Sequence, residues 1–588
     1  MDRRLAAILS SLVASGLAMG LMFAARSALQ VRTLPERIME AALLLVPPDQ
    51  FEGAIEKYGP AAKEYALYGT TAAMLLALIA IGLLAHRFVR RPAWLLAVGV
   101  GLWLVAMAAI MPLTGAGVFA TSLFQNPILV NVVYLGIGLA YASVLLLGRI
   151  AAPGLSLSSG QAPEPGFYTA PARRAFLAGT AGTLASLAVT IWLGKSSTQV
   201  ASSLPLASLP PSEPPGPAPT TASAPSPVAT SPSLSAVARP SSKPSTANPP
   251  PSQSAAPTPF IYPSPPPERP LQRDKDGALL AVNRPKGQLQ PAVTPNDDWY
   301  TVTKNAGGDP RLEAQDWRLI VDGSVNRPVQ LDYPTLVKLP QVTVYKSLEC
   351  ISNLTAKCEL TSFGCDLIST AKWTGARLQD VMALAGGLKP GVVALAAVGA
   401  DEFSSALPAS AASDPDVILA YMMNDAVLPR EHGFPVRVLI PDRYGMKNAK
   451  WIVNLKAMTQ AYVDWYGQRN WSQTGFVKTM SRIDVPAPGA KIDAGQAQIA
   501  GIAYGGARGI AKVEYSADGG STWQPAKLEQ PLGKDTFVRW SGAFQIAPGQ
   551  TLQLVSRATD GSGALQTSTF NLPQPNGGTG WNAISVSA

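Results

Sequence analysis

Long apolar runs in the first third of the chain restrict its fold more than any other feature. Runs of helix-spanning length cover residues 5–25, 67–85, 93–112, 128–148 and 175–194. About twenty apolar residues are what an α-helix needs to cross a bilayer. Charged residues make up only 14% of the chain, whereas an average soluble domain has about 25%. We therefore expect a four-helix transmembrane region at residues 1–150 and a fifth span at residues 170–196.

Charges between the runs predict how the spans are oriented. Arginines flank alternate connections, at Arg3, Arg4, Arg87, Arg90, Arg91, Arg149, Arg173 and Arg174. The other connections carry no such excess, because residues 27–66 hold six acids and four bases and residues 113–127 hold no charge. The positive-inside rule places the arginine-rich ends in the cytoplasm. The sequence thus predicts a multi-pass protein of the cell membrane, with everything after Lys195 outside the cytoplasm.

The pair Arg173 and Arg174 has two interpretations. It precedes a weakly apolar stretch rich in glycine and alanine, as in a twin-arginine export signal, which is read by a receptor that exports folded proteins. It is equally consistent with ordinary positive-inside flanking of a membrane helix. Both interpretations stay open at this point.

A proline-rich segment separates the apolar part from the rest of the chain. Residues 201–270 contain 22 prolines among serine, threonine and alanine. Such a composition buries too little apolar surface to offset its ordering entropy. We expect residues 197–275 to be a disordered, semi-extended linker.

The supply of histidine and cysteine excludes several kinds of site. The chain has two histidines, His86 and His432, and three cysteines. A haem held by two histidines within the membrane helices is therefore excluded, as is a four-cysteine metal cluster within one chain. The net charge of +9 is not gathered into a block of lysine and arginine, so we expect no nucleic-acid partner.

Two soluble domains are expected after the linker. Residues 290–487 mix short β-like runs with a helix near 378–385, an α+β pattern, and the runs lie at 317–321, 342–348, 392–398, 436–440 and 451–455. Residues 488–588 contain closely spaced β-like runs separated by turn signals such as Asp518-Gly519-Gly520. That spacing is typical of a β-sandwich.

The segment 347–353, Ser-Leu-Glu-Cys-Ile-Ser-Asn, ends a predicted strand in Cys350 beside a small polar turn. It belongs to an ordered set of motifs, the others being 299–305, 373–378, 399–403, 432–437 (His-Gly-Phe-Pro-Val-Arg) and 444–451 (Tyr-Gly-Met-Lys-Asn-Ala-Lys-Trp). In this set the chain resembles the sulfite oxidase family over residues 295–485. Residues 490–588 resemble the immunoglobulin-like domain that follows in that family.

The resemblance implies a multidomain fold, with an all-α transmembrane bundle, an α+β molybdopterin domain and an immunoglobulin-like β-sandwich. It implies a molybdenum–molybdopterin cofactor whose metal is bound by the Cys350 thiolate, a soft ligand. The implied cofactor-binding residues are Tyr300, Thr301, Asn305, Cys350, Asp401, His432, Arg437, Lys447, Asn448, Ala449 and Lys450. The implied catalytic residues are Cys350, Lys304, Arg377 and Arg443.

The implied activity is oxidation of sulfite or a related oxyanion, with a separate electron carrier. Two alternatives are sulfoxide reduction by the same cofactor and a cofactor-free binding module. The family has Arg-Asn-His where this chain has Lys304-Asn305-Ala306, and its active-site tyrosine aligns with Trp471 at the end of the run 465–471. The second soluble domain either forms a homodimer or caps the first, and Cys358 and Cys365 either form a disulfide or remain thiols.

Overall fold

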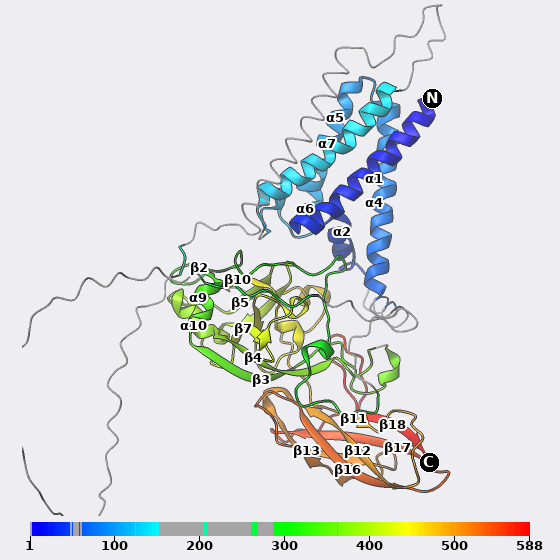
Figure 1. Cartoon of the computed structure of the whole chain (residues 1–588), viewed down its shortest axis with the longest axis vertical. Coiled ribbons are helices and arrows are strands. Elements are labelled where there is room, and N and C mark those ends of the chain that lie inside the picture. The colour runs from blue at the N-terminus through cyan, green and yellow to red at the C-terminus, as the bar shows by residue number, and fades with distance from the viewer. Residues whose placement is uncertain are drawn as a thin grey trace, which may run out of the picture.

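The structure is a computed structural model of the whole chain. It describes residues 3–46, 61–123, 125–151, 205–207, 260–268, 286–361 and 363–588, with positions 50, 54 and 58. In order along the molecule, a group of helices is followed by a mixed domain and a β-rich domain (Figure 1). The predicted fifth span, its arginine pair and most of the predicted linker lie outside the described residues.

Long apolar helices make up the N-terminal part. Its helices are α1 (Arg3–Leu29), α2 (Leu34–Ala42), α4 (Ala61–Phe88), α5 (Leu95–Val105), α6 (Met111–Leu113) and α7 (Pro127–Ala151). A π-helical turn at Ala106–Ile110 joins α5 to α6. Among the described residues, four stretches are long and apolar enough to cross a membrane, namely Arg4–Leu29, Ala62–Phe88, Pro92–Leu113 and Pro127–Ile150. The first four predicted runs are therefore confirmed as helices that suit a membrane.

Small residues let these helices approach closely. A Cβ atom on Gly99 of α5 would lie 2.2 Å from the carbonyl oxygen of Gly138 in α7. Small residues at such crossings are how membrane helices gain van der Waals contact, because lipid gives no hydrophobic driving force between them. An alanine at Gly99 would therefore force α5 and α7 apart.

The short helix α2 lies between the long helices and the mixed domain (Figure 1). It begins in a capping box, in which Glu36 N donates to Thr33 Oγ1 and Thr33 N donates to the Glu36 carboxylate at 2.8 Å. This pairing satisfies two backbone donors at the helix start. Arg37 of this helix is 2% exposed, so its charge requires partners within the protein.

Two β-sheets form the central domain, residues 286–479. One has the order β2-β1-β10-β5-β6, with β1 (Arg318–Gly323), β2 (Val329–Asp332), β5 (Ala394–Gly399), β6 (Ser404–Pro408) and β10 (Ile452–Met458). The other has the order β3-β4-β7-β8 and β9 on β7, with β3 (Gln341–Glu349), β4 (Ile368–Arg377), β7 (Ile418–Met423), β8 (Ala426–Val427) and β9 (Arg437–Leu439). In the first sheet β1 and β10 are parallel, and the other pairs are antiparallel.

A single core fills the space around these sheets. Trp317, Trp373 and Trp451 are its largest side chains and are fully buried. The helices α9 (Tyr333–Val337) and α10 (Leu378–Leu384) contribute Leu336 and Leu378 to the same core. The five predicted strands and the predicted helix of this domain are confirmed, with shifts of a few residues at their ends.

One piece of the predicted linker pairs with the central domain. Ala207 N donates to Gln330 O at 2.8 Å, and Gln330 N donates to Pro205 O at 3.1 Å. Strand β2 is the edge of its sheet, so its outer backbone groups are free to pair with another extended segment. The expectation of an unpaired linker is therefore wrong at residues 205–207.

Two four-stranded antiparallel sheets form the C-terminal domain. Their orders are β11-β12-β16-β15 and β14-β13-β17-β18, with β11 (Met480–Val485), β12 (Gly495–Tyr504), β13 (Ile510–Ser516), β14 (Gln524–Pro525), β15 (Lys527–Leu528), β16 (Val538–Ile546), β17 (Thr551–Asp560) and β18 (Asn582–Ser587). Trp540 and Phe544 lie in the core between them. Strand β11 pairs with β12, so this domain begins before the predicted boundary at residue 488.

Candidate active site

Cys350 follows directly after strand β3, where the backbone leaves the sheet. Its backbone N–H donates to Leu367 O at 2.9 Å, which fixes the turn. The thiol is free, and the residue is 7% exposed. Burial raises the pKa of this thiol, and hydrogen bonds from Ser352 together with the Lys63 ammonium act in the opposite direction. No group of three or more histidine, cysteine or acidic residues that could hold a metal occurs in the described ranges. A metal beside Cys350 would therefore take its other ligands from a bound cofactor.

A cavity of about 740 Å³, part of it open to solvent, surrounds Cys350. Its wall comes from the segment before β1, the end of β3, the turn after β5 and the segments on either side of β9. The predicted site residues that line it are Tyr300, Thr301, Lys304, Cys350, Asp401, His432, Arg437, Asn448 and Lys450. Residues that are 150 positions apart in the sequence thus meet at one cavity.

Arg437, which is buried, and Lys450, which is partly buried, place two cations in the cavity wall, and neither forms an ion pair with a carboxylate of the described residues. Arg437 donates to His432 O at 2.9 Å and to Asn448 O at 3.1 Å, and its Nε is buried without a hydrogen bond. Lys450 Nζ donates to Glu431 O at 2.7 Å and to Val302 O at 3.3 Å. Burial lowers the pKa of Arg437 to about 10 and also lowers that of Lys450. Cations in a cavity wall that are not held by a direct ion pair suit an anionic ligand, and the phosphate of a pterin cofactor fits them.

His432 lies beside these cations as a neutral group. Burial lowers its pKa well below the ordinary value, and Lys450 and Arg437 act in the same direction. Its ring stands edge-on to Trp299, with centroids 6.1 Å apart. Gly433, at φ +117°, follows, and a Cβ atom there would lie 3.1 Å from the Cβ atoms of Arg437 and Lys450. The glycine therefore keeps both cations close to the histidine.

Five predicted residues do not line this cavity. Asn305 donates to Asp401 Oδ2 at 3.1 Å and lines a neighbouring cavity that shares Asp401. Lys447 is paired with Asp464 in the protein interior, and Ala449 packs in the core. Arg377 lies at the end of β4, where it precedes α10. Arg443 stacks on Phe476, with its guanidinium carbon 3.3 Å from the ring centroid.

Tyr466 lines the cavity and is not among the predicted residues. Burial raises the pKa of its phenol, and the Cys350 thiol acts in the same direction. Trp471, which the sequence places at the family's tyrosine position, packs against Tyr466 at a centroid distance of 6.1 Å instead. The run 465–471 begins with two adjacent aromatic residues, Trp465 and Tyr466, and this pair was the sequence signal that could have indicated Tyr466. The structure places Tyr466, and not Trp471, in the cavity wall.

The N-terminal helices contact two residues of the cavity wall, Thr303 and Lys304, which no sequence pattern indicates. Lys304 Nζ lies 3.1 Å from Glu40 Oε1 of α2, and Arg32 forms a second ion pair with the same carboxylate. Burial would raise the pKa of Glu40, but Lys304 and Arg32 lower it to about 2. Lys63 Nζ at the start of α4 donates to Thr303 O at 2.7 Å. The connection between α1 and α4 therefore closes one side of the site.

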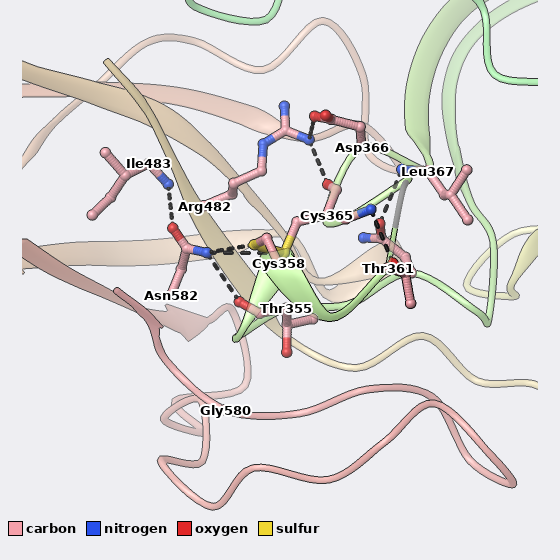
Figure 2. Close-up of a disulfide and its surroundings, with 12 residues drawn as sticks. Thr355, Cys358, Thr361, Cys365, Asp366, Leu367, Arg482, Ile483, Gly580 and Asn582 are labelled. Atoms are coloured by element: carbon pink, nitrogen blue, oxygen red, sulfur yellow. Dashed lines mark hydrogen bonds and ion pairs between the residues drawn. A yellow bond between two sulfur atoms is a disulfide. The ribbon is translucent and has the colours of Figure 1, made fainter. Parts of the chain in front are cut away.

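A disulfide holds the loop that follows Cys350 against the C-terminal domain. Cys358 and Cys365 form the bridge, with their Cα atoms 5.2 Å apart. Figure 2 shows Asn582 Nδ2 of β18 contacting this loop, at 3.2 Å from Cys358 Sγ and 3.4 Å from Thr355 O. Arg482 of β11 donates to Cys365 O at 2.6 Å (Figure 2). The bridge and these contacts anchor the end of the loop that follows Cys350.

Known proteins match the chain in both soluble domains. Residues 306–466 match the oxidoreductase molybdopterin binding domain, and residues 475–572 match the Mo-co oxidoreductase dimerisation domain. Mitochondrial sulfite oxidase of Mus musculus is 31% identical over 319 residues, covering 47% of this chain and 58% of that enzyme. Sulfite oxidase of Arabidopsis thaliana is 26% identical over 361 residues, covering 52% and 91%. NADH nitrate reductase of Ulva prolifera is 33% identical over 324 residues, covering 45% and 38%.

The fold and the site together define the class of protein. The chain contains an oxidoreductase molybdopterin binding domain followed by a Mo-co oxidoreductase dimerisation domain. In these two domains it is similar to the sulfite oxidases, and these matches support the resemblance to the sulfite oxidase family that the sequence motifs predicted. The match spans less than two thirds of the length of the first of these relatives.

Proposed function

We propose that this chain is a membrane-anchored oxidoreductase that oxidises a small sulfur oxyanion, with sulfite as the leading candidate. In that reaction sulfite and water give sulfate, two protons and two electrons, and the electrons pass to a separate carrier. The observation that carries the proposal is the cavity itself, where a free cysteine faces buried lysine and arginine side chains. A cationic wall suits an anionic substrate and an anionic cofactor.

The residues around the cavity fit a molybdenum–molybdopterin cofactor. Cys350 would supply the protein's one soft thiolate ligand. Arg437 and Lys450 would bind the pterin phosphate, and neutral His432 and Asn448 would hydrogen-bond the pterin. When bound, the cofactor supplies two-electron oxygen-atom transfer. The protein's contribution is to hold it, to orient the substrate and to exclude water.

Lys304 and Tyr466 are the proposed substrate-side residues. Both line the cavity with Cys350. Burial lowers the pKa of Lys304, Arg32 acts in the same direction, and Glu40 opposes both. The phenol of Tyr466 stays protonated because its pKa is raised, so it can donate a hydrogen bond to a substrate oxygen. Arg377 and Arg443 are left out of this proposed set because neither lines the cavity.

The contacts of the N-terminal helices support the proposed orientation in the membrane. Arg32, Arg37 and Lys63 bind the central domain, and all three belong to the connection 27–66, which the charge pattern places outside the cytoplasm. We infer that the soluble domains lie on that side, and that Arg173 and Arg174 belong to a twin-arginine signal that exports them folded. We infer further that the C-terminal domain is an immunoglobulin-like sandwich through which two copies pair.

Paired steady-state assays on the purified full chain test the substrate. One uses sulfite with ferricyanide as acceptor, and the other uses a methyl sulfoxide with reduced benzyl viologen as donor. We expect saturable sulfite oxidation. Turnover of the sulfoxide alone would contradict sulfite oxidation and favour the reductase.

A further inference from the structure

The start of α4 brings a second lysine against the part of the cavity wall where Lys304 lies. Lys63 Nζ donates to Thr303 O at 2.7 Å, and Thr303 and Lys304 are neighbours in the cavity wall. Lys63 is close enough to interact electrostatically with both the Cys350 thiol and the Lys304 ammonium. Figure 1 shows the lower end of α4 beside the central domain. A residue of the membrane part thus lies at the candidate active site.

Most of the other charged side chains near Lys63 form ion pairs that join the N-terminal helices to the central domain. Arg37 binds the Glu402 carboxylate with two hydrogen bonds, of 2.7 and 3.0 Å. Arg32 and Lys304 share the carboxylate of Glu40. These five side chains form one buried network of three cations and two carboxylates. Buried charges of this kind are stable only when they are paired.

Three further charged groups, Asp309, Asp401 and Arg469, lie beside this network. Asn305 Nδ2 bridges two carboxylates, at 3.1 Å from Asp401 and 2.9 Å from Asp309. Arg469 donates to the backbone oxygen of Glu40 at 3.3 Å. Together with the five side chains of the network, these three groups give four cations and four carboxylates. Lys63 is the fifth cation, and it forms no ion pair within the part of the chain that the structure describes. Within this set of groups Lys63 is therefore the extra cation, and Glu40 and Asp309 attract it without a direct ion pair.

We propose that Lys63 and Lys304 together bind the oxyanion substrate, and that Glu40 is the positioning residue that holds Lys304. An ammonium has three N–H donors. Lys63 uses one on Thr303 O, and Lys304 uses one on Glu40, so both retain donors for an anion. The inference rests on the proposed function and deepens it, because the active site then requires the connection between the first two membrane helices.

Equilibrium binding of sulfate tests this without turnover. The full chain in detergent is titrated with sulfate, and binding is followed by tryptophan fluorescence, since Trp465 lies near Lys304 at 5.7 Å from its ammonium. Lys63→Ala should weaken sulfate binding about tenfold or more, because a charge-assisted hydrogen bond is lost. Lys63→Arg should restore most of the affinity, because it keeps the charge.

Lys478→Ala is the matched control. Lys478 Nζ also makes a single hydrogen bond to a backbone oxygen, Gly577 O at 3.1 Å, but Gly577, unlike Thr303, is not part of the cavity wall. Its replacement should leave sulfate affinity unchanged. Unchanged affinity in Lys63→Ala, an equal loss in Lys478→Ala, or no sulfate binding by the wild type would each overturn the inference. Lys63-dependent sulfate binding without sulfite turnover would support the anion site and reject the proposed substrate.

Discussion

Lys304 Nζ lies 3.1 Å from Glu40 Oε1, although the two residues are 264 positions apart in the chain. One residue lines the cavity around Cys350, and the other belongs to a short helix between two apolar spans. The pair is buried, so each charge stabilises the other in a medium that screens little. The contact joins the apolar part of the chain to its oxidoreductase domain at the site of the proposed chemistry.

Removing the Lys304 ammonium should weaken oxyanion binding. Lys304→Ala loses one charge-assisted contact, worth about 1.5 to 3 kcal/mol, and should raise KM for sulfite roughly 10- to 150-fold. KM for a neutral sulfoxide should change much less. Steady-state kinetics of wild type and variant with both compounds measure this. A KM for sulfite equal to that of the wild type would remove Lys304 from the substrate site.

Acid should release α2 from the central domain. Glu40 has its pKa lowered to about 2 from the ordinary 4.5, so its contribution to docking is complete above pH 4.5 and is lost as the pH falls toward 2. Hydrogen exchange of residues 34–42 should therefore speed up within that window. Glu40→Gln should dock more weakly at neutral pH and respond less to acid, because one of the carboxylates that holds α2 no longer titrates, while Glu402 still does, with its pKa lowered by Arg37 and Arg32 against burial. Identical pH profiles for the two proteins would contradict the assignment.

Tyr466→Phe should lower kcat more than it raises KM. The phenol is the proposed hydrogen-bond and proton donor, and such groups contribute about 100-fold or more to turnover. Trp471→Phe is the control, because Trp471 contacts Tyr466 without lining the cavity. If Trp471→Phe lost as much turnover as Tyr466→Phe, the tyrosine would have a packing role only.

Export of the soluble domains should depend on the arginine pair. In the Arg173→Lys, Arg174→Lys double variant the charge is kept but the receptor signal is lost. The first four spans should still insert, while the soluble domains stay inside the cell and are protected from external protease. Protease accessibility that matches the wild type would favour plain positive-inside flanking.

Local patterns predicted most of the fold and much of the site. Apolar runs gave the four long helices, and short β-like runs gave strands such as β3 and β10, because both patterns report burial of nearby residues. Cys350, His432, Arg437 and Lys450 were predictable because each belongs to a short motif. The predicted start of the C-terminal domain, residue 488, lies one strand too late, because β11 resembles its neighbours in composition.

Long-range contacts could not be predicted in the same way. Lys63 and Glu40 meet the site only through the docking of α2 and α4, and no pattern along one chain records such a contact. Arg377 and Arg443 were predicted as cations near the substrate, and neither lines the cavity. Tyr466, which does line it, was not predicted because the run 465–471 can be aligned in two registers.

The molybdenum content of the purified full chain, together with its turnover of sulfite, tests the central claim most directly. Elemental analysis of folded protein, from cells supplied with molybdate, should find a molybdenum atom for each chain. Cys350→Ser should fold and lose turnover, because a hydroxyl cannot replace a soft thiolate ligand. Folded wild-type protein without molybdenum would contradict the account and leave a cofactor-free binding module, and turnover near the wild-type rate in Cys350→Ser would contradict the role of Cys350 as the metal ligand.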